Sequence, residues 1–211
     1  ACMRPISAVL IGLLALVLAA SCSPVHRRGA GAAGPAQPSG VWPGRKVDGS
    51  VLLPNQWSLR PVGRQLELGD FPVNIALHPG GQYAAILHCG CGPHEIIVVD
   101  VVELTVVSRT RIAEAFYGLE FNREGNTLYC SGSNAEVVYA FDFKSGVLSG
   151  RHRYRLRDTR EKGVPAGLAV DNSRQQLYAA NVWGHRVSRV DLTRKSRVLD
   201  IPLGTPRALE R

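Results

Sequence analysis

The sequence predicts an all-β fold in which a four-stranded unit is repeated along the chain. Short apolar segments rich in β-branched residues alternate with Gly-, Asn- or Asp-containing turns, as at residues 177–192. Aspartates that end a predicted strand recur at intervals of about 40–50 residues, at Asp100, Asp142 and Asp191. Each interval has room for four short strands, which is the pattern of a propeller blade. We therefore expect a β-propeller of four-stranded antiparallel blades.

The repeats also define approximate boundaries for the blades. We place three blades at residues 71–112, 115–156 and 164–203, with a fourth beginning near residue 205. Residues 63–69 align with the last strand of a blade and form an orphan N-terminal strand in this interpretation. Because propeller rings contain about 4–8 blades, we expect residues 51–211 to be a partial propeller and the chain to be a fragment of a longer protein.

The N-terminal residues predict export. Met3 and Arg4 precede an apolar run at residues 6–20, which is shorter than the ~20 residues of a membrane-spanning helix. Residues 1–22 are therefore interpreted as a signal peptide. The end of this segment, Ala19-Ala20-Ser21-Cys22, resembles the lipobox of bacterial lipoproteins, with Leu18 one step early. That resemblance implies a lipid anchor at Cys22 and a periplasmic or cell-surface location; an ordinary secretory signal is the alternative.

The segment after the signal peptide predicts a flexible tether. Residues 23–50 are rich in Gly, Ala and Pro and show no apolar periodicity in their first part. Such a segment buries too little apolar surface to order itself. A tether at this place would hold the folded part away from the membrane.

The composition is that of a globular protein with an excess of basic residues. Of the 211 residues, 45% are hydrophobic and 20% are charged, and the formal net charge is +8. A net charge of this sign can attract nucleic acid or an anionic surface. The basic residues are scattered over predicted turns and strands and belong to no nucleic-acid-binding motif, so we expect no nucleic-acid partner.

The repeat resembles a known family. Leu177-Tyr178-Ala179-Ala180-Asn181, followed by Val187 to Leu192, is similar to the YVTN repeat of YncE-like β-propellers, with Ala-Ala in place of Val-Thr. The resemblance covers residues 51–211. Residues 52–57 and 69–74 further resemble the propeller part of exported bacterial proteins in which a phosphoesterase domain of the alkaline phosphatase type follows the propeller. This second resemblance implies a catalytic domain outside the chain, so it assigns no catalytic residue.

Strand order predicts which loops share one end of the propeller. In a four-stranded meander, the loop between the second and third strands and the connection to the next blade emerge at the same end. The longest such segments are residues 88–95, 157–163 and 181–186. Binding residues often lie on loops held by a rigid scaffold. The predicted ligand or partner face consists of His88, His94, Glu95, Asn181, Trp183, His185 and Arg186. The alternatives are that these residues vary neutrally on the surface or pack between blades without binding a ligand.

Histidines and cysteines cluster in the first of these loops. His88, Cys89, Cys91 and His94 are residue types that bind zinc, but their spacing is not one of the usual zinc patterns. A disulfide that uses two of Cys89, Cys91 and Cys130, and free thiols, are the other interpretations. We expect no metal and no cofactor.

Three functions are compatible with these features. The sequence contains no nucleophile elbow, P-loop, paired acid motif or catalytic triad spacing. The first hypothesis is an exported, membrane-anchored propeller that binds a protein or small-molecule partner. The alternative is the propeller portion of a phosphoesterase, whose partner would be the missing C-terminal domain. A further alternative is a lactonase-like propeller enzyme that acts from its central face.

The lipobox interpretation predicts a change of cellular fraction. Replacing Cys22 by Ala should release the protein from the membrane fraction and leave export intact, because the acylated thiol is lost and the signal peptide is retained. Fractionation followed by immunoblotting measures this. A wild-type protein that is already soluble and begins at another residue would show that the interpretation is wrong.

Overall fold

The computed structural model describes residues 41–193 and 197–204. These residues belong to two compact units, which divide between Arg60 and Pro61. The expected signal peptide with Cys22, most of the expected tether and the fourth blade predicted near residue 205 lie outside the described residues. No helix in the described ranges is long and apolar enough to cross a membrane.

The first unit contains a small antiparallel sheet. Its strands are β1 (Gly44–Arg45), β2 (Val51–Leu52) and β3 (Ser58–Leu59). Asp48 shapes the turn before β2, because its Oδ1 accepts hydrogen bonds from the backbone N (3.0 Å) and Oγ (2.6 Å) of Ser50. We expected a tether up to residue 50 and the propeller from residue 51, whereas this sheet crosses that boundary. The segment is ordered by strand pairing and by a local Asx turn, and neither feature is visible in the amino-acid composition.

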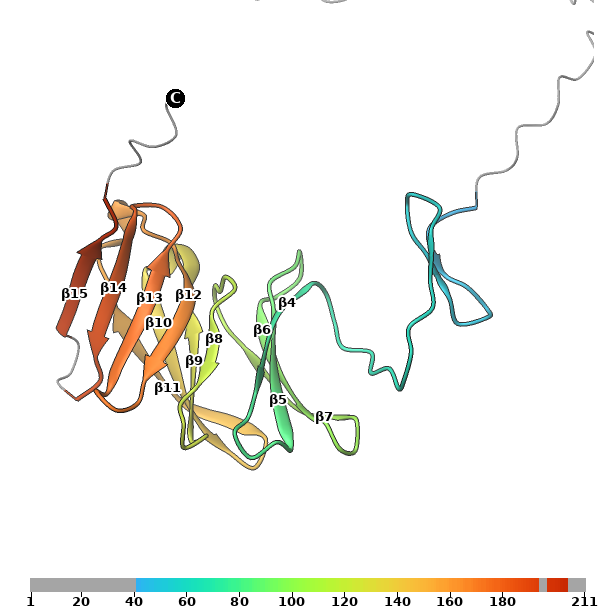
Figure 1. The fold of residues 1–211 in the computed structure, drawn as a ribbon, viewed down its shortest axis with the longest axis horizontal. Helices are drawn as coiled ribbons and strands as arrows, with labels where there is room; N and C mark the ends of the chain where they lie inside the picture. The colour runs from blue at the N-terminus through green and yellow to red at the C-terminus, as the bar shows by residue number, and fades with distance from the viewer. Residues whose placement is uncertain (1–40, 194–196, 205–211) are drawn as a thin grey trace, which may run out of the picture. The chain divides into compact units, whose positions relative to one another are not determined.

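The second unit is built from three four-stranded antiparallel sheets, each made of consecutive strands (Figure 1). The first sheet consists of β4 (Pro72–Leu77), β5 (Tyr83–His88), β6 (Glu95–Asp100) and β7 (Thr105–Arg111). The second consists of β8 (Leu119–Phe121), β9 (Thr127–Ser131), β10 (Val137–Lys144) and β11 (Val147–Arg155). The third consists of β12 (Pro165–Asp171), β13 (Gln176–Asn181), β14 (Arg186–Asp191) and β15 (Arg197–Pro202). These sheets confirm the predicted propeller fold, and we call them blades 1, 2 and 3.

The segment that precedes blade 1 contains no strand. We expected residues 63–69 to form an orphan strand, but the structure assigns them no strand and no ladder partner among the described residues. Leu66 and Leu68 instead pack against Ile86, Ile97 and neighbouring apolar side chains of blade 1. A β-strand requires a paired neighbour for its backbone groups. This segment is held instead by side-chain packing and by the hydrogen bond that Arg109 Nη2 donates to the backbone oxygen of Leu68 at 2.9 Å.

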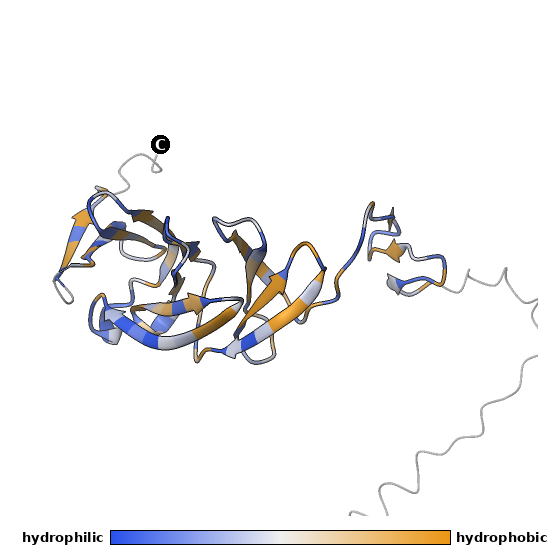
Figure 2. Ribbon diagram, turned by 90° about the horizontal axis from the view of Figure 1, so that it is seen from below, coloured by the Kyte–Doolittle hydropathy of each residue, from blue (hydrophilic) through white to orange (hydrophobic). Residues whose placement is uncertain are grey.

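In blades 1 and 2, apolar side chains are buried on both faces of the sheet. In β6, Ile96 and Val98 belong to the core between blades 1 and 2, while Ile97 lies on the opposite face of the sheet. In β10, Tyr139 faces blade 1 and Val138 faces blade 3. Since side chains alternate across a sheet, burial of both faces requires apolar residues at consecutive positions. This explains the long orange stretches of the strands in Figure 2.

The turn aspartates act structurally in two of the three blades. Asp100 Oδ1 accepts hydrogen bonds from the backbone N of Val102 and Glu103, each at 2.9 Å. Asp191 Oδ1 accepts equivalent bonds from the backbone and hydroxyl of Thr193. Asp142 differs because β10 continues to Lys144, so this aspartate lies inside the strand rather than at its turn.

The blades contact one another through corresponding strands. The first strands β4, β8 and β12 are neighbours in series, and the last strands β7 and β11 also meet. Two different grooves result, one along the first strands and one between the last strands. The chemistry of each depends on the side chains that these strands present.

A buried ionic network joins blade 2 to blade 3. Arg157 follows β11, and its Nη1 donates to Glu136 Oε2 at 2.6 Å and to Asn181 Oδ1 at 2.8 Å. Its Nη2 donates to Ser188 Oγ at 2.6 Å and forms an ion pair with Asp200 at 3.2 Å. The Glu136 side chain is 0% exposed. A buried carboxylate of this kind depends on its partner, because an uncompensated charge in the interior is very unfavourable.

The network also fixes the backbone around it. Glu136 Oε1 accepts a hydrogen bond from the backbone N of Val164 at 2.8 Å, which ties the loop before β12 to blade 2. A Cβ at position 163 would clash with the Arg157 guanidinium. Gly163 is therefore required for close approach of the chain to the buried charge.

Removal of the arginine should destabilise the propeller strongly. We expect Arg157→Met to lower the free energy of unfolding by about 3–5 kcal/mol, because Glu136 is left buried and unpaired. Urea denaturation followed by circular dichroism measures the loss.

Two variants control this experiment. Arg160→Gln removes an arginine whose side chain is 93% exposed and should change stability by less than about 0.5 kcal/mol. Adding Glu136→Gln to Arg157→Met should recover part of the loss, since the orphaned charge is removed. Equal stability of Arg157→Met and wild type would contradict the assigned role of the network.

Candidate functional site

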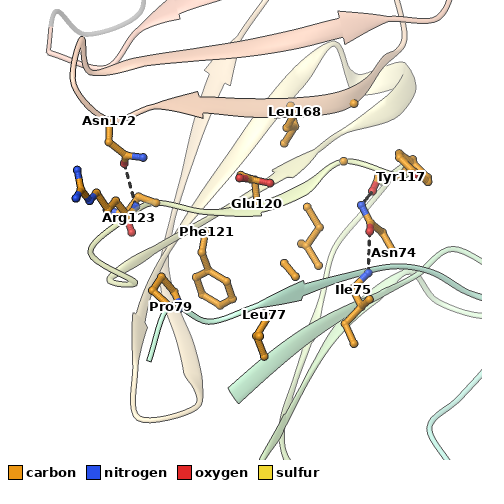
Figure 3. Close-up of a pocket in the computed structure, with 15 residues that line it drawn as sticks. Asn74, Ile75, Leu77, Pro79, Tyr117, Glu120, Phe121, Arg123, Leu168 and Asn172 are labelled. Carbon is orange, nitrogen blue, oxygen red and sulfur yellow. Dashed lines mark hydrogen bonds between the residues drawn. The ribbon is translucent and has the colours of Figure 1, made fainter. Parts of the chain in front are cut away.

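The main candidate site is the groove along the first strands of the three blades (Figure 3). Its volume is about 510 Å³, and its walls come from β4, β8 and β12 with the segments that flank them. Gly118 lies where β8 begins, and a Cβ there would clash with the backbone oxygen of Ala166 and with Leu168. The glycine thus permits the close approach of blades 2 and 3 beside the groove.

Glu120 is the acidic side chain in the middle of the groove (Figure 3). Its neighbours Leu119 and Phe121 are buried in the core between blades 1 and 2. Because side chains alternate along a strand, Glu120 lies on the other face of β8, toward Leu168. Burial raises the pKa of the Glu120 carboxyl. A carboxyl group in this position is suited to accept or exchange a proton with a ligand.

Asparagines occupy the two ends of the groove (Figure 3). At one end, Asn74 Nδ2 donates to the backbone oxygen of Tyr117 at 2.7 Å, and Asn74 Oδ1 accepts from the backbone N of Ile75 at 2.8 Å. At the other end, the backbone N of Arg123 donates to Asn172 Oδ1 at 3.0 Å. Both amides therefore link one blade to the next. The arrangement combines a central carboxyl group with amide groups at either end.

The residues predicted as a ligand face divide between buried and exposed positions. Asn181 is buried, and besides binding Arg157 its Nδ2 donates to Ser188 Oγ at 3.0 Å. Arg186 pairs with Asp200 at 3.1 Å. Trp183 and His185 are exposed in the β13–β14 loop. The structure thus places Asn181 and Arg186 in the network between blades and leaves Trp183 and His185 open to solvent.

The other three predicted residues belong to blade 1. His94 Nδ1 accepts a hydrogen bond from the backbone N of Ala115 at 3.0 Å. Glu95 pairs with Arg109 at 2.7 Å. His88 is 1% exposed at the end of β5, and neither ring nitrogen has a partner among the described residues. His94 and Glu95 therefore have structural partners, whereas His88 is a buried polar group without one.

The cysteines of the described chain are free thiols. Cys89 is half-buried, Cys91 is exposed and Cys130 is buried in the core between blades 1 and 2. Burial raises the pKa of the Cys130 thiol and that of Cys89. In the described ranges no three His, Cys, Asp or Glu residues are grouped so that they could hold a metal ion.

Glu120 is the groove residue that sequence reasoning missed. The signal was present in Leu119-Glu120-Phe121, where a charged residue stands between two apolar ones at the opening of a blade. Strand order predicts which loops lie together and gives no information about the faces of the first strands. Their faces line the groove only because neighbouring blades bring them together.

The buried imidazole of His88 predicts a pH-dependent stability. Burial lowers the pKa of His88, and the backbone of Ile86 and then the carboxylates of Glu95 and Asp70 oppose this shift to a smaller extent. The unfolded chain, with an imidazole pKa of about 6.5, therefore binds the proton more readily than the folded chain. Stability should be fully present above about pH 6.5 and should fall as the pH drops from there toward the lower pKa of the folded state.

His88→Leu should remove this component of the pH dependence and should raise stability at pH 6, because two unpartnered nitrogens are removed. Urea midpoints at pH 7.5 and pH 6 measure it, with the exposed His152→Leu as the matched control. If His88→Leu and His152→Leu show the same slope with pH, the buried ring does not carry the effect.

Comparisons with known proteins agree with the fold. The sequence model of the family described as "SMP-30/Gluconolactonase/LRE-like region" matches residues 94–208. No curated protein matches the chain.

Three solved structures illustrate the likeness. A luciferin-regenerating enzyme shares 14% identity and a TM-score of 0.52, over 63% of this chain and 46% of that one. The hydrazine synthase of Kuenenia stuttgartiensis shares 18% identity and a TM-score of 0.53, over 72% and 53%. The gluconolactonase of Xanthomonas campestris shares 20% identity and a TM-score of 0.50, over 72% and 54%.

At such identities the solved structures show the fold alone, and the chain spans about half the length of each. The family match covers more than half of the chain, from the end of the β5–β6 loop through all of blades 2 and 3. The chain belongs to the SMP-30/gluconolactonase/LRE-like family.

Proposed function

We propose that this chain is an exported, membrane-anchored propeller module that binds a small polar ligand in the groove along β4, β8 and β12. The observation that carries the proposal is the position of Glu120 in the middle of that groove, with its pKa raised by burial. Export through residues 1–22 and anchoring at Cys22 are parts of the same proposal. The YVTN-type repeat supports placing the protein among exported propellers.

The walls of the groove favour a ligand with both polar and apolar parts. Leu168 of β12 is an apolar side chain on the wall beside Glu120, whereas the Ile75 and Leu77 side chains of β4 point away from β8 (Figure 3). Tyr117 is 53% exposed at one end and offers an aromatic surface. Ligand sites typically combine apolar walls with a few polar groups that fix orientation. A sugar or sugar-acid ring has hydroxyl groups at its edge and apolar C–H faces. Such a ring therefore suits a groove that presents both polar and apolar groups.

A second function, lactone hydrolysis, is favoured by the family match together with Glu120. The Xanthomonas campestris relative is described as a gluconolactonase. In such a reaction water adds to the lactone carbonyl carbon and the ring C–O bond breaks. The carboxylate of Glu120 would take a proton from the water and return it to the leaving oxygen, which is the task of a general acid–base group with a raised pKa.

The phosphoesterase alternative is a separate proposal, supported by the resemblance at residues 52–57 and 69–74. In it the propeller would present substrate to a catalytic domain that follows it in a longer protein. Reading the coding sequence beyond Arg211 tests this directly: a metal-dependent hydrolase domain there would support it, and its absence would refute it.

The groove is tested with two probes, D-glucose for binding and D-glucono-1,5-lactone for hydrolysis. Glu120→Ala should weaken glucose binding by about 10–100-fold, because hydrogen bonds to a charged group contribute roughly 1.5–3 kcal/mol. Chemical shifts measured by NMR give the dissociation constants. Glu103→Ala, at an exposed residue of the β6–β7 turn, is the control and should bind as wild type does.

The lactone separates the two functions. Glucose binding without lactone hydrolysis above the spontaneous rate supports a binding module, and hydrolysis that Glu120→Gln abolishes supports the enzyme. Failure of the wild-type chain to bind glucose and to hydrolyse the lactone would reject the proposed ligand class for this groove.

A further inference from the structure

A short segment covers part of the outer face of blade 1, which is the face that points away from blade 2. Residues 66–71 precede β4 and belong to no strand, and we call them the strap. Its Leu66 and Leu68 pack against apolar residues of β5 and β6, namely Ala84, Ile86, Ile97 and Val99. Beside them on the same face, Ile75 and Leu77 are each 63% exposed. The strap therefore shields part of an apolar face from water.

Hydrogen bonds to side chains help to hold the strap on the blade. Arg109 Nη2 donates to the backbone oxygen of Leu68 at 2.9 Å. The backbone N of Gly92 donates to Asp70 Oδ2 at 3.0 Å. Neither bond belongs to the ladders that join β4 to β7, so both can break while the four strands stay paired. Segments held in this way open at a lower free energy than the core does.

His88 lies beneath the strap. It ends β5 on the same face as Ile86, and it is 1% exposed. A Cβ at position 69 would lie 3.6 Å from His88 Cδ2, so the backbone of Gly69 covers the imidazole ring. Neither ring nitrogen has a hydrogen-bond partner among the described residues. The strap thus closes over a buried polar ring that these residues do not compensate.

On the blade, the charged neighbours of His88 are a carboxylate and two arginines. Glu95 of β6 is the ladder partner of His88, and its carboxylate pairs with Arg109 of β7 at 2.7 Å. Arg111 of β7 is the ladder partner of Glu95 and continues the same row. The one carboxylate in this row is already paired, so a protonated His88 would compete with arginine for it.

The strap and β4 add one further charge near His88. The Asp70 carboxylate of the strap acts electrostatically on the ring, but its Oδ2 already accepts the hydrogen bond from Gly92. β4 places Pro72, which carries no charge, opposite His88. Burial is the largest influence on the ring and lowers the pKa of His88, although the carboxylates oppose this shift.

We propose that the strap is a pH-sensitive cover that separates from blade 1 when His88 is protonated. An imidazolium ring needs water or a free partner, and separation of the strap is the smallest change that brings water to it. Opening uncovers Ile86 and Ile97 and joins them to the exposed Ile75 and Leu77. In acid the protein would then present a continuous apolar surface that it keeps covered at neutral pH.

Proton linkage gives the sign of the effect. With the strap closed the pKa of His88 is lowered, whereas in the open form the solvated ring takes its ordinary pKa of about 6.5. The closed form is therefore fully favoured above about pH 6.5. Below that value opening should increase up to about tenfold for each pH unit, until the lower pKa of the closed form is reached.

The first test follows apolar exposure of the full chain between pH 7.5 and pH 5. Fluorescence of the dye 8-anilinonaphthalene-1-sulfonate should rise below about pH 6.5, because the dye binds the uncovered face. Far-UV circular dichroism should stay constant, since the blades remain paired. His88→Leu should abolish the rise in fluorescence. His152→Leu, at an exposed histidine, is the matched control and should behave as wild type does.

The second test changes the strap and follows the His88 ring by NMR titration. Leu68→Ala removes packing that closes the strap, so the pKa of His88 should move up toward about 6.5. Val102→Ala, at an exposed residue of the β6–β7 turn, is the control and should leave the titration unchanged.

A third variant should stabilise the closed strap. Gly69 has no positive φ, and a Cβ there would meet only ordinary contacts of 3.6–3.8 Å. Gly69→Ala therefore fits the closed form and restricts the open one. The dye signal at pH 6 should fall about two- to fivefold relative to wild type.

The proposal is overturned by any of three results. Absence of the fluorescence rise, or its persistence in His88→Leu, would show that His88 controls no opening. Loss of the strand signal together with the rise would indicate unfolding of the blade instead of separation of the strap. An unchanged His88 titration in Leu68→Ala would show that the strap does not cover the ring. None of these measurements involves a ligand of the Glu120 groove, so a failure of that proposal is distinguishable from a failure here.

Discussion

The buried pair of Arg157 and Glu136 is the interaction on which the junction of blades 2 and 3 depends. Apolar packing between sheets is tolerant of small rotations, because it has no direction. A guanidinium group that binds partners in both blades at hydrogen-bond distance fixes their relative position much more closely. Both walls of the Glu120 groove at this junction, β8 and β12, are thereby held in register. The ionic network therefore supports the geometry of the Glu120 groove, although Arg157 and Glu136 do not line that groove.

Most of the blade architecture follows from local pattern. An apolar run such as Ile96 to Val99 predicts a strand without showing which of its faces is buried. The turns with Gly, Asn or Asp separate one strand from the next. The network between blades does not follow from pattern, because Glu136, Arg157 and Asn181 are far apart in sequence. They lie in loops or at the end of a strand, where the local sequence looks equally polar whether it is exposed or buried. The predicted ligand face therefore mixed solvent-exposed residues such as Trp183 with interior ones such as Asn181.

The two grooves show what strand order determines and what it leaves open. Consecutive strands of blades 1 and 2 run from the groove of Glu120 to the groove between β7 and β11, so each of these two blades contributes its first strand to one groove and its last strand to the other. The alternation in Leu119-Glu120-Phe121 predicts that the Glu120 carboxyl group lies on the other face of the strand from the side chains of Leu119 and Phe121. Which face is open depends on the packing of adjacent blades, and this information is absent from any single strand.

Because β4, β8 and β12 are each the terminal strand of their sheet, one side of their main chain has no further strand to pair with. Main-chain groups that flank β8 already form hydrogen bonds at both ends of the groove: the carbonyl of Tyr117 accepts from Asn74, and the backbone N–H of Arg123 donates to Asn172. Peptide groups are the same whatever side chain they carry. A ligand that displaced either asparagine would therefore meet backbone donors and acceptors that remain whatever side chain is substituted, proline excepted. Side chains along the same strands would then be free to change with the ligand, and one scaffold would accommodate different small molecules without a change of fold.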